Sequence, residues 1–136
     1  MIDIKRIRSN IDSFYRHKNT EKQVQHNSKY CAKYYDSKQW KDLRESYKLQ
    51  HPLCECCLSN GIVTPMEEVH HKKRFMSGVN EEAKWSLLLN PNNVISLCKE
   101  CHNIAHRYMK KYNTDTAGIK EINYYKDNME EDYLNR

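Results

Sequence analysis

Two Cys-x-x-Cys pairs constrain the fold of this chain more than any other feature of its sequence. Cys54 and Cys57 form the first pair, and Cys98 and Cys101 form the second. Each pair can present two thiolates from one tight turn, and four thiolates complete the tetrahedron that Zn²⁺ prefers. The pairs therefore predict a closed structural zinc site. Redox-active dithiols are the alternative, but nothing nearby resembles the βαβ unit of a thioredoxin.

The rest of the composition makes such a metal site more important. The chain has 136 residues, enough for one domain with extensions, and 30% of them are charged. The mean hydropathy is −1.00. So polar a chain buries little apolar surface, and small domains of this kind often depend on a metal for stability. We expect Cys56 to be a buried or idle thiol and Cys31 to be a free thiol without a special role.

Charge is distributed unevenly along the chain. Residues 1–50 carry 12 Lys or Arg and 6 Asp or Glu, residues 51–112 carry 8 and 6, and residues 113–136 carry 3 and 6. A basic body suits a polyanion such as nucleic acid, and a surface of scattered solvated charges is the alternative.

No segment of the sequence has the character of a membrane span or a secretory signal. The apolar runs are short, and the N-terminus has no apolar h-region. We therefore expect a cytoplasmic protein that has no membrane partner.

Hydrophobic spacing predicts two helices before the first cysteine pair. Apolar residues at helical spacing indicate a basic helix within residues 1–30. Residues 36–50 fit a firmer helix that Asp36 or Ser37 can cap. The apolar stripe of that helix consists of Trp40, Leu43 and Tyr47.

The middle of the chain fits the order strand, long connection, strand and helix. Residues 62–71 contain a strand towards their end, residues 93–97 form a β-branched strand, and a helix follows from Cys101. The connection, residues 72–92, includes a short helix from Glu81 to Leu89.

Four of the seven histidines fall beside the cysteine pairs. His70 and His71 end the first predicted strand, while His102 and His106 are four residues apart on the predicted helix and share one face. Successive helical residues point about 100° apart, so His102 is directed away from a site that Cys101 closes. The four imidazoles therefore predict a second, open metal site. We interpret the other histidines as surface or packing residues: His17, His26 and His51.

The order of these motifs resembles that of the HNH endonuclease family. The family pattern has Cys-x-x-Cys, a strand ending in Asp-His or His-His, an Asn that opens a second strand, and Cys-x-x-Cys-His entering a helix. In this chain the matching segments are CECC, EVHH and NNVISLCKECH. With YDSKQWKDLRESYKLQHPLCECC upstream, the chain is similar to small phage HNH endonucleases encoded near the terminase. It departs from many relatives in HHKKRFMSGVNEEAKW, which has neither an apolar-Pro stretch nor a Gly-Gly turn.

The resemblance implies a fold and a role for individual residues. The fold is a small α+β one, with a ββα-metal (His-Me finger) core and a structural zinc held by four cysteines, flanked by N- and C-terminal helices. His71 matches the general base, and His70 and His102 match ligands of a catalytic divalent metal. His106 resembles an additional helix histidine of the colicin-type nucleases. Asn93 matches the middle letter of the motif and would fix the loop that carries the base; an ordinary turn asparagine is the alternative.

The chemistry implied is hydrolysis of a DNA phosphodiester. A neutral imidazole can activate water, and a divalent cation can stabilise charge on the phosphoryl and leaving oxygens. All-histidine ligation favours Zn²⁺, Ni²⁺ or Mn²⁺, whereas few protein ligands leave the water and phosphate positions that Mg²⁺ prefers. We expect Mg²⁺ or Mn²⁺ in use, with Zn²⁺ or Ni²⁺ as alternatives. A basic rim that grips DNA phosphates would consist of Lys72, Lys73, Arg74, Arg107, Lys110 and Lys111.

The resulting hypothesis is a metal-dependent endonuclease that nicks or cuts double-stranded DNA. We divide the chain into a basic N-terminal extension (1–35), an HNH nuclease domain (36–112, motif core 54–106) and an acidic C-terminal tail (113–136) with a helix from Thr116 to Tyr133. The resemblance further implies a role in phage genome packaging in a bacterial host cytoplasm, with terminase or portal proteins as partners. The alternatives are a non-catalytic zinc-stapled DNA-binding module and a module that docks on a packaging motor.

Overall fold

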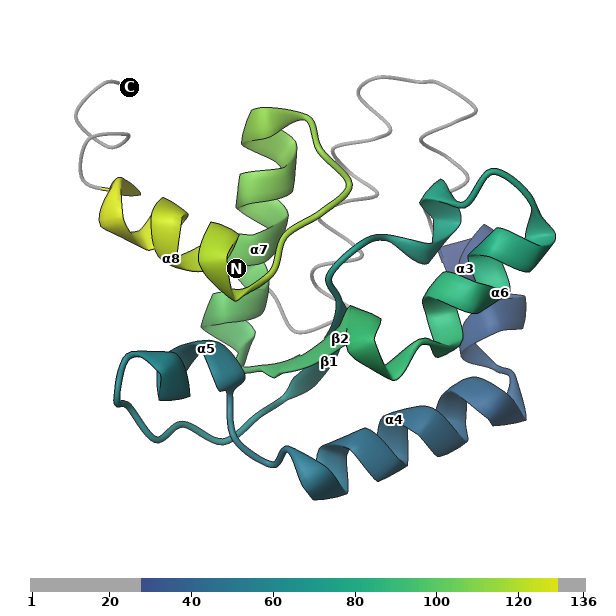
Figure 1. Cartoon of the computed structure of the whole chain (residues 1–136), viewed down its shortest axis with the longest axis horizontal. Coiled ribbons are helices and arrows are strands. Elements are labelled where there is room, and N and C mark those ends of the chain that lie inside the picture. The colour runs from purple at the N-terminus through teal and green to yellow at the C-terminus, as the bar shows by residue number, and fades with distance from the viewer. Residues whose placement is uncertain (1–27, 130–136) are drawn as a thin grey trace.

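A computed structural model describes residues 28–129 and has a two-stranded antiparallel sheet at its centre, with helices on both sides (Figure 1). The basic helix expected within residues 1–30 falls almost entirely outside the described part of the chain. Within that part, no helix is both long enough and apolar enough to cross a membrane. The elements in chain order are α3 (Ser28–Tyr35), α4 (Lys38–Gln50), α5 (Glu55–Ser59), β1 (Glu68–His71), the 3-10 turn η1 (Phe75–Ser77), α6 (Glu81–Leu89), the 3-10 turn η2 (Pro91–Asn93), β2 (Val94–Leu97), α7 (Lys99–Tyr112) and α8 (Ile119–Asp127).

Helix α4 confirms the helix expected over residues 36–50. Ser37 is its N-cap and accepts a hydrogen bond from the Trp40 backbone N–H at 3.2 Å. Trp40 and Tyr47 are buried, so the apolar stripe faces the interior. The Tyr47 hydroxyl donates to Glu55 Oε2 at 2.6 Å, and the same oxygen accepts from the Ser96 backbone N–H at 2.7 Å. Glu55 therefore joins α5 to both α4 and β2.

The pairing of the two strands places adjacent histidines on opposite faces of the sheet. His70 pairs with Ile95 and His71 pairs with Val94. Because successive side chains of a strand point to opposite faces, His70 lies on the face that α7 covers and His71 lies on the face that α4 covers.

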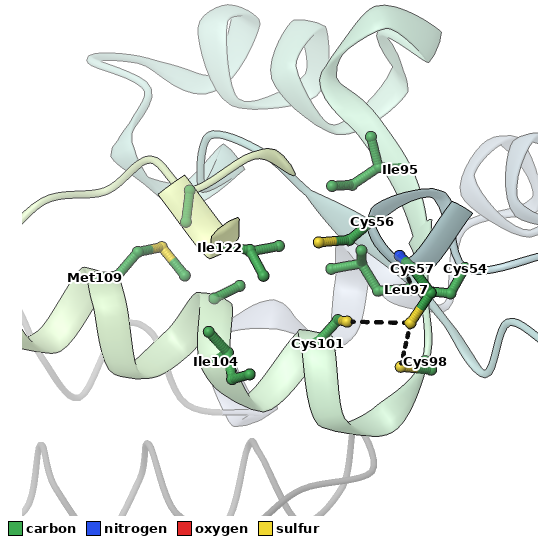
Figure 2. Packing of buried hydrophobic residues seen from close by; sticks show 12 residues of the cluster. Cys54, Cys56, Cys57, Ile95, Leu97, Cys98, Cys101, Ile104, Met109 and Ile122 are labelled. Atoms are coloured by element: carbon green, nitrogen blue, oxygen red, sulfur yellow. Dashed lines mark hydrogen bonds between the residues drawn. The ribbon is translucent and has the colours of Figure 1, made fainter. Parts of the chain in front are cut away.

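Each face of the sheet has a core of its own. The cysteine core lies between the sheet, α5, α7 and α8 (Figure 2) and contains Cys54, Cys56, Cys57, Ile95, Leu97, Cys98, Cys101, Ile104, Ala105, Met109, Ala117 and Ile122. The aromatic core lies between the sheet, α3, α4 and α6 and contains Cys31, Tyr34, Trp40, Tyr47, Val69, Phe75, Leu88 and Val94. Residues on both sides of the predicted boundaries at 36 and 112 enter these cores, and the boundaries themselves stay a prediction.

The connection between the strands is folded into short elements. Helix α6 has the bounds expected from the sequence, and its N-cap Asn80 accepts from the Ala83 backbone N–H at 2.8 Å. Gly78 precedes it at a point of close approach, because a Cβ there would lie 2.6 Å from the Lys84 backbone nitrogen. A glycine is therefore required for η1 to pack against the first turn of α6.

After α7 the chain turns back towards the sheet. Asn113 ends the helix in the left-handed conformation, with φ of 51°. Residues 113–118, which we call the return segment, then run beside the end of β1. The Ala117 N–H donates to the Lys72 carbonyl at 2.8 Å, and the Arg74 N–H donates to the Asp115 carbonyl at 2.9 Å. Because this pairing uses residues 115–117, the helix expected from Thr116 to Tyr133 begins only at Ile119, and α8 ends at Asp127.

Candidate active site and metal centres

The four cysteines of the Cys-x-x-Cys pairs meet in the cysteine core. Cys54 and Cys57 come from the turn at the start of α5, and Cys98 and Cys101 come from the end of β2 and the first turn of α7. Their sulfur atoms all lie within 4.8 Å of one another. The Cys57 sulfur is 3.9 Å from that of Cys98 and 3.7 Å from that of Cys101, as the dashed lines of Figure 2 show.

These separations suit a zinc ion. Four sulfurs about 2.3 Å from one Zn²⁺ in a tetrahedron are about 3.8 Å apart. All four cysteines are buried and none forms a disulfide. The group could therefore hold zinc, with no position left for a substrate.

The two other cysteines lie outside this group. Cys56 is buried, and its Sγ donates to Asn123 Oδ1 at 3.4 Å. Cys31 is also buried, in the aromatic core.

A second group of possible metal ligands lies between β1 and α7. Imidazole nitrogens of His70, His102 and His106 lie within 4.8 Å of one another. Because residues four apart share a helix face, α7 presents His102 and His106 together towards His70 at the end of β1. His70 and His102 are buried and His106 is half-buried. Cys101 of α7 belongs to the cysteine group, so one helix carries parts of two sites.

The distances within this group are compatible with a divalent cation. The Nε2 atoms of His102 and His106 are 3.1 Å apart, and two neighbouring ligands about 2.0–2.2 Å from one ion are about 2.8–3.6 Å apart in octahedral or tetrahedral geometry. An ion would allow both atoms to keep their lone pairs. His70 Nε2 lies 2.9 Å from the Ala117 carbonyl. A carbonyl only accepts, so Nε2 donates and Nδ1 keeps the lone pair that a metal needs.

Burial keeps these imidazoles uncharged. It lowers the pKa of His70 to about 3, against the smaller opposing effect of the hydrogen bond to Ala117. Burial is also the largest cause that lowers the pKa values of His102 and His106 far below 6.5, followed by the charges of neighbouring imidazoles. Neutral imidazole is the form that binds a metal.

His71 lies on the opposite face of β1, in an aromatic environment. Its ring packs on Trp40, with centroids 4.7 Å apart, and against the edge of Phe75 at 5.2 Å. His71 Nε2 lies 3.0 Å from the Leu88 carbonyl and must donate to it, so Nδ1 keeps its lone pair. Burial lowers the pKa of His71 to about 4, so the ring is neutral at neutral pH.

Asn93 fixes the segment that follows His71. Its Oδ1 accepts from the Lys73 backbone N–H at 3.0 Å, and its Nδ2 donates to the Lys73 carbonyl at 2.9 Å and to the Leu87 carbonyl at 3.0 Å. Leu87 and Leu88 belong to the last turn of α6, where helix carbonyls have no partner within the helix. Asn93 and His71 therefore both bond to the end of α6.

The six basic residues expected to bind DNA come shortly after the histidines in the chain, three after the end of β1 and three within α7. Lys72, Lys73 and Arg74 directly follow β1, and the others lie in the second half of α7. Lys73, Lys110 and Lys111 are exposed, and Lys72, Arg74 and Arg107 are half-buried. Lys111 Nζ lies 5.5 Å from the centre of the Tyr112 ring, within reach of a cation–π contact.

With this geometry in view, the chain was compared with known proteins. No family model matches the sequence, and no curated protein matches it. The structure is similar to the crystal structure of the HNH endonuclease of the deep-sea thermophilic bacteriophage GVE2 with manganese ion. The similarity has a TM-score of 0.54 at 26% sequence identity and covers 68% of this chain and 97% of that chain.

The chain has an HNH endonuclease fold. The four-cysteine group fits the zinc type of this fold, and the similarity supports a nuclease function. The expected small α+β architecture is thereby confirmed.

Several contacts of this HNH fold leave no recognisable signal in the sequence. The carbonyls of Leu88 and Ala117 orient His71 and His70, and a backbone atom leaves no mark in a sequence. Trp40 was expected in the core, yet its contact with His71 depends on how α4 packs against β1. Lys126, which lies on α8 within the predicted tail, donates a hydrogen bond to the Cys101 sulfur at 3.2 Å.

Proposed function

We propose that this protein is a metal-dependent endonuclease that hydrolyses phosphodiester bonds of double-stranded DNA. One observation carries the proposal: three neutral imidazoles converge at the end of β1, where a fourth is held with one nitrogen free to accept a proton. Similarity to a solved HNH endonuclease supports the same conclusion independently.

His71 is the proposed general base. The Leu88 carbonyl holds the Nε2 proton, so the Nδ1 lone pair can take a proton from the attacking water. A pKa of about 4 makes the free imidazole a weak base. The negative phosphate of a bound duplex would raise that pKa towards neutrality, because it stabilises the imidazolium.

His70, His102 and His106 are the proposed ligands of a divalent cation, which we expect to be Mg²⁺ or Mn²⁺. When bound, such an ion supplies Lewis-acid stabilisation of charge on the phosphoryl and leaving oxygens. The Ala117 carbonyl fixes the tautomer of His70, and α7 fixes the spacing of the other two ligands. Zn²⁺ and Ni²⁺ are the alternatives, since all three ligands are imidazoles.

Asn93 and the zinc are proposed to position these groups without touching the substrate. Asn93 holds the backbone of Lys73, two residues after the base. A zinc at Cys54, Cys57, Cys98 and Cys101 would fasten α5 to the start of α7 and so fix His102 relative to β1. The basic residues that follow β1 and those in the second half of α7 would bind phosphates on either side of the cleaved bond.

The proposal is tested on supercoiled plasmid DNA in EDTA, Mg²⁺, Mn²⁺, Ni²⁺ and Zn²⁺. The parent protein should cut only with a divalent ion, and relaxed circles against linear products distinguish nicking from double-strand cleavage. His71→Ala should slow cutting about 10²–10⁴-fold, the usual contribution of a general base. His51→Ala is the matched control, because His51 stacks on Tyr47 away from this site.

His71→Ala should melt cooperatively but at a lower temperature than the parent, because it removes a buried ring that packs on Trp40. Its DNA affinity below that temperature should stay near the parent value, which separates lost chemistry from lost folding. Cutting by His71→Ala at the parent rate would contradict the assignment of the base. Salt-dependent DNA binding without cutting in any of the four metals would favour the non-catalytic binding module instead.

We further propose that the protein acts beside a phage packaging motor, which is the role that the resemblance of its sequence implies. This is tested by capture of terminase or portal proteins with the full chain and with a chain that lacks residues 130–136. Deletion of the whole segment 113–136 would be uninformative, because the return segment holds His70.

A further inference from the structure

Helix α8 packs over the cysteine group and brings an ammonium to it. Ile122 of α8 is buried in the cysteine core, to which the four cysteines also belong (Figure 2). One turn further along, Lys126 Nζ donates to the Cys101 sulfur at 3.2 Å. Lys126 is half-buried, and no carboxylate of residues 28–129 forms a salt bridge with it.

A second residue of α8 fixes the same face of the helix on the first cysteine turn. Asn123 lies three residues before Lys126, so the two side chains share a face. Asn123 Oδ1 accepts from Asn60 Nδ2 at 2.9 Å and from Cys56 Sγ at 3.4 Å, and its Nδ2 donates to Ser59 Oγ at 3.3 Å. These contacts hold α8 against α5 and set the place from which Lys126 reaches the sulfur.

The charge of a zinc site explains what this ammonium does. Four thiolates around one Zn²⁺ carry a net charge of about −2, and here they lie in a buried core. A hydrogen bond from an ammonium to a thiolate is charge-assisted and offsets part of that charge. Groups that bond to metal ligands in this way commonly change metal affinity about 10–100-fold when they are removed.

We propose that Lys126 is a positioning residue of the zinc site, which stabilises the zinc-bound form by hydrogen bonding to the Cys101 thiolate. The inference rests on the structural zinc proposed above, and it is independent of nuclease activity. It gives the C-terminal helix a role in metal retention, although all four cysteines precede that helix by at least 18 residues in the chain.

The test measures zinc affinity of the full chain by competition with a chelator of known affinity at one fixed pH. Lys126→Met, which keeps the aliphatic stem and removes the charge, should bind zinc about 10–100-fold more weakly than the parent. Lys126→Arg should stay near the parent, because it restores a cationic donor. Lys120→Met is the matched control on the same helix and should change nothing, since Lys120 is exposed. Lys126→Gln repeats the measurement with a polar uncharged side chain if the methionine variant does not fold.

Parent affinity in Lys126→Met would overturn the role of Lys126. Equal losses in the arginine and methionine variants would also overturn it, because they would show a need for packing and not for charge. Equal losses of zinc affinity in Lys120→Met and Lys126→Met would show that only the net charge of the helix matters, and would also overturn the proposal. A parent protein that binds no zinc would overturn both this inference and the proposed zinc site. A parent protein that binds zinc with the same affinity as Lys126→Met would overturn this inference and leave the zinc site standing.

Discussion

His70 and His71 are neighbours in the chain, yet each belongs to a different half of the molecule. His70 faces α7 and bonds to the return segment, while His71 packs on Trp40 and bonds to α6. The alternation of side chains along a strand separates them, and their position at the last two residues of β1 lets both reach the same end of the sheet. The proposed chemistry depends on these two hydrogen bonds, because each holds the proton on Nε2 and leaves the lone pair on Nδ1.

Asn93 provides a residue-scale prediction, because two of its three hydrogen bonds are donated by the amide N–H groups of its side chain. In the parent protein the Asn93 side chain donates hydrogen bonds to the carbonyls of Lys73 and Leu87. Asn93→Asp keeps the shape of the side chain but places a carboxylate oxygen against one of these acceptors and removes both donated bonds. The loss of two buried hydrogen bonds should lower the free energy of unfolding by about 2–4 kcal/mol, measured by urea denaturation at neutral pH. Asn92→Asp is the control, because Asn92 is exposed. Equal stability of the two variants would contradict this account of Asn93.

At the scale of elements, α6 connects the aromatic core to the candidate active site. Its last turn offers the carbonyls of Leu87 and Leu88 to Asn93 and His71. Its first turn carries Glu81, which accepts from the Tyr34 hydroxyl of α3 at 2.6 Å. A segment between two strands, which the sequence shows only as a long connection with a short helix, therefore orients the proposed base.

The contact between α3 and α6 gives a prediction of pH dependence. Burial, then the hydrogen bond and charge of Glu81, raise the pKa of Tyr34 from 10.0 to about 12. The folded state thus favours the protonated phenol. The stabilisation from this group is complete below pH 10 and is lost as the pH rises through about 12.

Ultraviolet absorbance of phenolate can measure this directly. The difference between the titrations of the parent and of Tyr34→Phe should show one group with a midpoint near pH 12. The same subtraction with Tyr124→Phe serves as the control, because Tyr124 is 52% exposed. A difference titration centred at pH 10 would show that Tyr34 is not held by Glu81 in solution.

At the scale of the whole molecule, the cysteine group joins segments that are far apart in the chain. Its four residues come from the start of α5 and from the start of α7, directly after β2, and they make up a third of the cysteine core. Zinc binding in small sites contributes about 10–16 kcal/mol at neutral pH, whereas the net stability of a domain is about 5–15 kcal/mol. The free energy of zinc binding would then be comparable to the free energy of unfolding of the whole domain.

Removal of zinc should therefore unfold the protein. A chelator titration followed by circular dichroism should show loss of helical signal and of the cooperative melting transition, and both should return when zinc is added. A chelator that leaves the melting curve unchanged would contradict a structural role for zinc. Mg²⁺ in place of zinc is the control and should not restore the fold, because Mg²⁺ prefers oxygen ligands.

The sequence by itself determined several of the elements and the residue types that could serve as metal ligands. The cysteine spacing, the stripe of α4, the strands on either side of the long connection and the shared face of His102 and His106 are all local patterns, set by helix and strand periodicity. For that reason the sequence predicts α4 and α6 nearly residue by residue. Its spacing also places the cysteines and the histidines in two separate groups of possible metal ligands, and the family resemblance suggests which histidines are the ligands.

Only the tertiary structure decided how these parts meet. The carbonyls that fix the two histidines of β1 come from residues 17 and 47 positions further along, at Leu88 and Ala117. Lys126 reaches Cys101 from a helix that the sequence assigned to an acidic tail. Such contacts depend on how α6, α8 and the return segment pack against the sheet, and backbone acceptors and long cationic side chains carry no periodic signal. Residue types thus predicted the chemistry, while packing set the orientation of each group.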